Sequence, residues 1–163
     1  MKIKLHDASR PPSETEIAAF EIATDCTVGD AYRRFLKQWN GAKPENNWFK
    51  VGERNHSSVT RFIPLAEIPK ELSLLKSELP RGSFPIAWDE SGNYVCLNSR
   101  RNGEVFFWDH ELPERTVTLS QGLDGFVDHV MEPFEPTKQK FEPHQVKSAW
   151  VDPEFLKQLK KKS

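Results

Sequence analysis

The densest polar cluster in the sequence is Asp109-His110-Glu111, which follows an apolar run at 105–108. A carboxylate, an imidazole and a second carboxylate are groups that bind metal ions or transfer protons. Consecutive residues at the end of a strand point to alternate faces, however, so three neighbours converge on one ion only where the strand bulges. We therefore favour a strand end whose polar groups satisfy the following turn, and we predict no metal site and no catalytic residue here.

The other candidate reactive groups match known catalytic or metal-binding patterns poorly. Residues 89–93 (DESGN) lack the alternating oxygen ligands and the final glutamate of a calcium loop, so they predict a hairpin turn. Cys26 and Cys96 have neither a CxxC pair nor a positioned histidine, which predicts two free thiols. Glycine-rich nucleotide loops and the GxSxG turn of serine hydrolases are also absent from the sequence. We expect a protein without enzyme activity and without a cofactor.

Charge is distributed unevenly along a chain whose net charge is −1. Residues 84–135 contain 10 acidic and 3 basic side chains, whereas residues 136–163 contain 7 basic and 3 acidic ones. The sequence lacks the domain-wide basic patch of a nucleic-acid-binding protein, and the lysines near the C-terminus would give only a weak, salt-sensitive interaction with phosphates. We therefore expect the acidic stretch to bind a basic protein surface rather than nucleic acid.

Apolar residues at helical spacing predict several of the elements that would carry these groups. Ser13 and Glu16 have the spacing of a capping box, so a helix should begin there. Residues 32–39 place apolar side chains at i, i+3, i+4 and i+7, which predicts a second helix. The same periodicity predicts helices over residues 68–79 and 123–130.

Period-2 alternation predicts a sheet in the middle of the chain. Three antiparallel strands joined by turns are predicted at 84–88, 94–97 and 105–108. Residues 116–119 add a further strand, and residues 59–65 predict a strand that Pro64 ends. Residues 41–57 are rich in Gly, Pro and Asn, and they predict a loop with at most one short strand.

The length of 163 residues predicts one domain, and no apolar run approaches the roughly 20 residues that span a bilayer. The first 30 residues lack the apolar core of a signal peptide, so we expect a soluble, cytoplasmic protein without membrane contact. We expect the domain to cover residues 1–131. Residues 132–163 form a proline-rich extension in this interpretation, ending in a short basic helix that begins at Asp152-Pro153.

Three segments, in this order, resemble the SUKH superfamily, bacterial immunity proteins that share a domain with fungal cell-wall-assembly regulators. Residues 31–44 (AYRRFLKQWNGAKP) resemble its Tyr-x-x-Phe-Leu helix followed by Asn-Gly-x-x-Pro. Residues 84–98 (FPIAWDESGNYVCLN) are similar to its strand, Asp, Gly-Asn turn and next strand, and residues 103–111 (GEVFFWDHE) to its most recognisable strand. A closing helix at 119–130 completes the resemblance, which begins near Glu14.

Two positions depart from the family pattern. Val28-Gly29 stands where the family usually has Leu-Pro, and Gly122-Leu123 where it often has Ser-Phe. Both pairs are compatible with a helix boundary, so they leave the subfamily open and the fold unchanged.

The resemblance implies an α+β fold in which helices pack around a mainly antiparallel sheet, in a single domain with a C-terminal extension. It also implies binding rather than catalysis, because many relatives sequester secreted or contact-delivered toxin domains, often nucleases, inside the producing cell. The acidic stretch fits this role, since a nuclease cleft that binds phosphates is usually basic and opposite charge accelerates association. The identity of the toxin and the oligomeric state are left open.

We predict that the partner-binding surface combines acidic residues of the 84–135 stretch with one tryptophan. An exposed tryptophan can anchor an interface, although packing of its loop onto the domain is the commoner role. The predicted contacts are Asp89, Glu90, Glu104, Asp109, Glu111, Glu114 and Trp48. The alternative is a housekeeping interaction or regulatory scaffold, in which the extension at 136–163 makes the partner contact.

Overall fold

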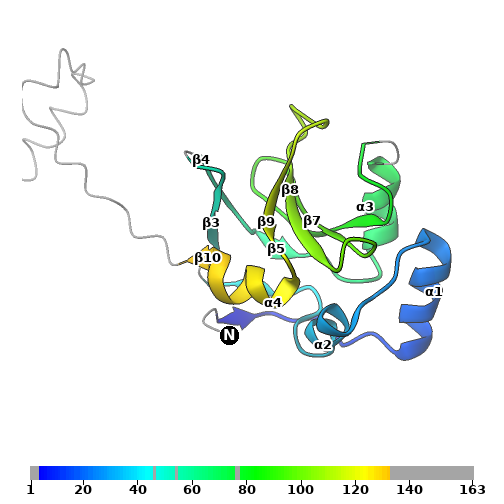
Figure 1. Cartoon of the computed structure of the whole chain (residues 1–163). Coiled ribbons are helices and arrows are strands. Elements are labelled where there is room, and N and C mark those ends of the chain that lie inside the picture. The colour runs from blue at the N-terminus through cyan, green and yellow to red at the C-terminus, as the bar shows by residue number, and fades with distance from the viewer. Residues whose placement is uncertain (1–3, 46, 54, 76–77, 133–163) are drawn as a thin grey trace, which may run out of the picture.

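The computed structural model describes residues 4–45, 47–53, 55–75 and 78–132. Its centre is an antiparallel sheet in which the strands lie side by side in chain order, from β5 to β9 (Figure 1). The strands of this sheet are β5 (Arg61–Phe62), β6 (Ser83–Trp88), β7 (Tyr94–Asn98), β8 (Glu104–Trp108) and β9 (Thr116–Ser120). The predicted three-stranded meander and the added strand at 116–119 are therefore confirmed.

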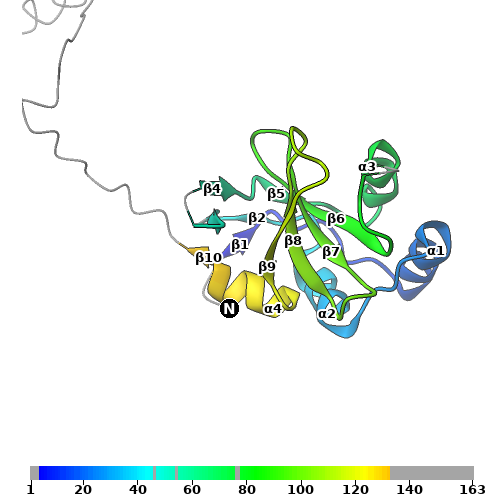
Figure 2. The ribbon, with the colours of Figure 1, turned by 45° about the horizontal axis from the view of Figure 1, so that its top comes forward.

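Two short sheets flank the central one. In the first, β1 (Leu5–His6) pairs with β2 (Lys43–Pro44). In the second, β3 (Trp48–Val51) lies between β4 (Asn55–Ser58) and β10 (Met131–Glu132). Figures 1 and 2 both show the β3–β4 hairpin on one side of the central sheet.

Helices cover the other sides of the sheet, which confirms the α+β fold class. They are α1 (Glu14–Thr24), α2 (Asp30–Trp39), α3 (Ile68–Leu74) and α4 (Leu123–Gly125), the last continuing into the π-helix η1 (Phe126–Val130). In both views α1 and α3 lie on the side of the sheet opposite the β3–β4 hairpin. The capping box of α1 is present, with the Glu16 N–H donating to Ser13 Oγ at 3.2 Å and the Ser13 N–H to Glu16 Oε2 at 2.8 Å.

Three of the predicted elements differ in the structure. The prediction of a loop with at most one short strand at 41–57 is wrong, because β2, β3 and β4 all form there. The polar sequence of β4 gives little strand signal, and its pairing with β3 compensates through the backbone hydrogen bonds. The predicted strand at 59–65 is reduced to the two residues of β5. Helix α3 stops at Leu74 rather than continuing to residue 79, because the chain changes to i to i+3 turns at Leu75.

Alternation along the strands sends side chains to two separate apolar clusters. Phe107 faces the main core, where its ring centroid lies 6.0 Å from that of Phe49 on β3. Phe106 and Trp108, its neighbours along β8, face the opposite side and pack with Leu75. The ring contact between Phe49 and Phe107 therefore holds the β3–β4 hairpin against the central sheet.

The remaining sequence predictions concern the two cysteines, membrane contact and the C-terminal region. Cys26 and Cys96 are free thiols, as predicted, and the structure buries both of them. Within the described residues, no helix is both long and apolar enough to cross a bilayer. The helix predicted at Asp152-Pro153 lies outside the described residues, and the boundary after residue 131 stays a prediction.

Asn40 is a buried amide that joins three segments of the chain. Its Nδ2 donates to the carbonyl of Arg10 at 2.7 Å, and its Oδ1 accepts from the Leu65 N–H at 2.9 Å. The backbone carbonyl of Asn40 accepts a further hydrogen bond from the Ser9 N–H, at 2.7 Å. The next residue, Gly41, has a φ of 68° and leaves no room for a Cβ, which would lie 2.8 Å from the ring of Pro64. The Asn-Gly pair therefore fixes where the N-terminal segment and the β5–α3 connection meet.

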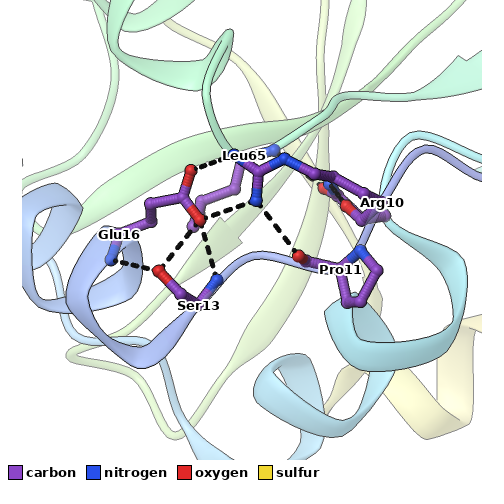
Figure 3. Close-up of polar contacts among 6 residues, drawn as sticks. Arg10, Pro11, Ser13, Glu16 and Leu65 are labelled. Carbon is purple, nitrogen blue, oxygen red and sulfur yellow. Dashed lines mark hydrogen bonds and ion pairs between the residues drawn. The ribbon is translucent and has the colours of Figure 1, made fainter.

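The start of α1 is held beside this junction by an ion pair. Figure 3 shows the Glu16 carboxylate between Ser13 and Arg10, whose guanidinium donates to both carboxylate oxygens at 2.5 and 2.9 Å (Figure 3). The Arg10 side chain and the two Ser13 hydrogen bonds lower the pKa of Glu16 to about 2. The first turn of α1 is thus tied to the segment that Asn40 anchors.

Replacing Asn40 by alanine should destabilise the fold by about 2–4 kcal/mol, because the Arg10 carbonyl and the Leu65 N–H both lose their partner. Urea unfolding of the full chain measures this free energy. Gln38→Ala, which removes an exposed amide from α2, is the matched control and should change the stability little. Equal stability of the two variants would contradict the role assigned to Asn40.

Replacing Glu16 by glutamine should make the stability of the fold depend less strongly on pH. A lowered carboxyl pKa stabilises the fold above the pKa of the unfolded chain, near 4.5, and this contribution disappears as the pH falls towards 2. We expect the wild-type melting temperature to exceed that of Glu16→Gln at pH 6, and the two values to converge near pH 2. A gap that stays constant over this range would show that the ionised carboxylate is not what stabilises the fold.

Candidate functional site

A groove of about 420 Å3 lies between the β3–β4 hairpin and two turns of the central sheet. These turns are the β6–β7 turn (89–93) and the β8–β9 loop (109–115), and we call the hollow between them and the hairpin the acidic groove. Trp48, Asp89, Glu90 and Asp109 all line it. The structure thus brings together four of the residues predicted from charge and composition, although they come from three separate segments of the chain.

Asp89 shapes the groove from within. Its Oδ1 accepts from the backbone N–H groups of Ser91 and Asn93, at 2.7 and 2.9 Å, which closes the β6–β7 turn. Its Oδ2 accepts from Ser57 Oγ on β4 at 2.7 Å and from Asn93 Nδ2 at 3.2 Å. The carboxylate is therefore already engaged by the fold, and its role in the groove is to position the hairpin relative to the turn.

Asn93 connects the two turns. Its Oδ1 accepts from the His110 backbone N–H at 3.1 Å and from His110 Nδ1 at 2.8 Å. The next hydrogen bond along the loop runs from the Glu111 N–H to Asp109 Oδ1, at 2.9 Å. The polar groups of Asp109-His110-Glu111 therefore satisfy the loop that follows β8, which is the interpretation that the sequence favoured for this cluster.

The outer carboxylates, those of Glu90, Glu111 and Glu114, differ from Asp89 in their exposure to solvent. Glu90, Glu111 and Glu114 are exposed, and none of the ion pairs found between described residues includes them or Asp109. On α1, by contrast, Glu14 contacts Lys37 at 3.2 Å and Glu16 contacts Arg10. The lining of the groove thus contains carboxylates outside all of these ion pairs, together with the basic Arg115, whereas these helix carboxylates are paired.

The floor of the groove is apolar. Trp48, Val51, Phe107 and Val117 contribute its apolar lining, with Leu112 of the β8–β9 loop at its edge. Trp48 is half-buried, in line with the commoner role of packing onto the domain, but it belongs to strand β3 rather than to an irregular stretch. The strand pairing of β3 with both β4 and β10 explains the difference, because it holds the backbone of Trp48 in the sheet.

Glu104 lies apart from the other predicted contacts. It begins β8, at the end of the strand opposite Asp109, and only 12% of its side chain is exposed. Its carboxylate accepts from Thr118 Oγ1 at 2.7 Å and from Arg101 at 3.4 Å. Glu111 and Glu114 do not line the groove themselves; they belong to the β8–β9 loop, of which Asp109, Leu112 and Arg115 line it.

Sequence reasoning missed Ser57 and Asn93, which hold the walls of the groove together. Neither residue carries charge, and each acts through a partner far from it in the sequence, Asp89 for Ser57 and His110 for Asn93. The only sequence signal was the Gly-Asn turn of the family resemblance, which placed Asn93 at the start of a strand without indicating its partner.

The part of the chain that the structure describes contains no cluster of three or more His, Cys, Asp or Glu side chains able to hold a metal ion. Burial raises the pKa of the Cys96 thiol well above its usual value, and burial also raises that of Cys26. Both thiols therefore stay protonated at neutral pH and are poor nucleophiles.

A second concavity of about 430 Å3 lies between α1 and residues 64–69. Its lining is mostly apolar, and its charged groups, Arg10 and Glu16, pair with each other. The two nearby helices also carry exposed apolar side chains, Ile22 on α1 and Leu74 on α3. This concavity differs from the acidic groove in having no unpaired charge from its lining residues.

Comparison with known proteins identifies the family. Residues 11–129 match the model of the SMI1 / KNR4 family (SUKH-1), which is well over half of the chain. The chain belongs to the SUKH-1 family. The match includes all three segments that form the acidic groove, and it resolves the subfamily that the sequence resemblance left open.

One curated relative extends the comparison beyond the family model. The SPbeta prophage-derived uncharacterized protein YokK of Bacillus subtilis (strain 168) is 26% identical to this SUKH-1 chain, over 82% of the chain and 84% of the relative. No solved structure matches the chain. The relative adds no activity, since its own function is uncharacterized.

Replacing Asn93 by alanine should loosen the β8–β9 loop with little effect on the rest of the fold. The His110 amide loses its acceptor, so hydrogen–deuterium exchange should accelerate at residues 109–115, and stability should fall by about 1 kcal/mol. Asn55→Ala, an exposed amide of β4 that also lines the groove, is the matched control. Unchanged exchange at 109–115 would contradict the coupling of the two turns.

Proposed function

We propose that the protein is an immunity protein that binds and neutralises a cognate toxin domain, with the acidic groove as its binding surface. The SUKH family includes immunity proteins, and this membership gives the class of function. The observation that carries the proposal is the groove itself, an apolar floor surrounded by carboxylates without ion-pair partners among the described residues.

The chemistry of the groove indicates the kind of partner. A rim of unpaired carboxylates attracts a basic surface and increases the rate of encounter, whereas the apolar floor favours slow dissociation once water is excluded. The catalytic clefts of nucleases are basic because they bind phosphates, so a nuclease domain fits the groove best. Trp48 supplies the aromatic anchor at its floor.

A second candidate function is an interaction scaffold, and the apolar concavity beside α1 favours it. Such a surface binds through apolar contacts rather than charge, and Ile22 and Leu74 extend its apolar character onto the neighbouring helix surfaces. Ala23, which lines the concavity and is exposed, is a position where a larger side chain fills the space without entering the core.

The first experiment is a pull-down with the tagged full chain from its native host, followed by mass spectrometry. A stoichiometric partner with a toxin-like C-terminal domain supports the proposal. A partner retained by wild type but lost in Ala23→Arg would instead favour the scaffold, because that substitution blocks the concavity beside α1 and leaves the acidic groove intact.

Charge reversal at Glu111 and Glu114 should slow association with the toxin domain and flatten its salt dependence. Two reversed charges on the rim are expected to lower the association rate constant roughly tenfold at low salt, with a smaller change in the dissociation rate constant. Stopped-flow or surface-plasmon kinetics over a range of salt concentrations measures both constants.

Glu67→Lys/Glu78→Lys makes the same change of charge at exposed residues outside the segments that wall the groove. This control should bind almost as wild type does. If the two double variants slow association equally, the groove is not the surface that meets the partner.

A further inference from the structure

The last described strand delivers the chain to the edge of the acidic groove. β10 ends at Glu132, which is paired in register with Trp48 of β3. Trp48 itself lines the groove. Figures 1 and 2 show β10 beside β3, on the hairpin side of the central sheet. Residues 133–163 lie outside the described part of the chain, but their point of attachment is therefore next to this surface.

The charge of the segment that follows is opposite to that of the groove. Residues 136–163 contain 7 basic and 3 acidic side chains. The two turns that wall the groove, at 89–93 and 109–115, contain five carboxylates and a single arginine. The outer carboxylates have no ion-pair partner among the described residues, so they are available to lysine side chains.

We propose that the C-terminal segment of this chain, residues 136–163, occupies the acidic groove when no partner is bound. Its nearest lysines, Lys138 and Lys140, contact the carboxylates of Glu90, Glu111 and Glu114. The proposal builds on the proposed function only in using the same groove, and it adds a regulation of that surface: a basic partner has to displace the chain's own segment.

The length of the segment is sufficient. Lys138 and Lys140 follow Glu132 by 6 and 8 residues, a reach of at most about 20–29 Å for an extended chain. Glu132 is paired with Trp48, which lines the groove, so an extended segment of this length can bring both lysines to it. A short tether also gives an effective concentration in the millimolar range, which raises the occupancy of several weak ion pairs that form together.

Docking of the segment would make partner binding competitive and selective. A partner with scattered basic residues would have to outcompete a tethered segment, whereas a partner that also fills the apolar floor gains contacts that lysines alone do not make. The segment would thus protect the groove from weakly basic surfaces and leave the cognate partner able to bind.

Zero-length cross-linking of the full chain tests the proposal without any partner. A carbodiimide joins lysine amines to carboxylates that are in contact, and mass spectrometry of the monomer identifies the linked residues. Lys37 and Glu14, whose Nζ and Oε1 lie 3.2 Å apart, provide the internal positive control. We expect cross-links from Lys138 or Lys140 to Glu90, Asp109, Glu111 or Glu114 in the monomer, at a yield comparable to that of the control pair.

A matched pair of variants tests the assignment to the nearest lysines. In Lys160→Glu/Lys161→Glu the cross-links of Lys138 and Lys140 should remain. In Lys138→Glu/Lys140→Glu the remaining lysines of the segment should lose their cross-links to the groove. Equal losses in both variants would show attraction by net charge alone and would overturn the assignment.

Two other results would overturn the docking itself. One is a monomer in which Lys37 and Glu14 are joined but lysines of the segment link to other surfaces or to none. The other is a set of cross-links to the groove found only in dimers, which would make a second copy the occupant. Because no toxin is present, each of these results leaves the proposed function standing, and failure to find a toxin partner leaves the cross-linking result standing.

Discussion

The buried amide of Asn40 is the interaction on which the arrangement of the domain depends. It satisfies a carbonyl at Arg10 and an N–H at Leu65, two backbone groups that would otherwise be left without a partner near the core. Leu65 follows β5 and β4 closely in the sequence, and β4 forms one wall of the acidic groove. A side chain at the end of α2 thus helps to set the position of the acidic groove, although it does not line that groove.

The parts of the fold that sequence predicted are those whose signal is local. Residues 32–39 show the helical spacing of apolar residues within themselves, and the strands at 84–108 alternate and are joined by turn residues. The β3–β4 hairpin was missed because its strand β4 (Asn55–Ser58) is polar, and the contacts that stabilise it are non-local. These contacts are the backbone pairing with β3 and the hydrogen bond from Ser57 to Asp89.

The candidate site shows the same division between local and non-local information. Net charge identified the β6–β7 turn and the β8–β9 loop as acidic, and the structure places these two segments side by side. Charge alone does not separate Asp89, whose carboxylate closes a turn, from Glu90, which faces solvent one residue later. Nor does it separate Glu104 from Asp109, because strand β8 carries them to opposite ends of the sheet.

The two turns of the groove carry two kinds of carboxylate, one that accepts hydrogen bonds within the fold and others that are exposed to solvent. This difference explains how an acidic surface is compatible with a stable fold. Like charges that crowd one surface repel each other, and this cost falls when one of them accepts hydrogen bonds from fixed donors. Asp89 accepts four such bonds, so its charge is stabilised by the turn and by β4. The exposed Glu90, Glu111 and Glu114 accept none of these hydrogen bonds, so a basic side chain can approach them. The groove therefore keeps its shape through the Asp89 carboxylate, while the exposed carboxylates of the two turns leave its surroundings negatively charged.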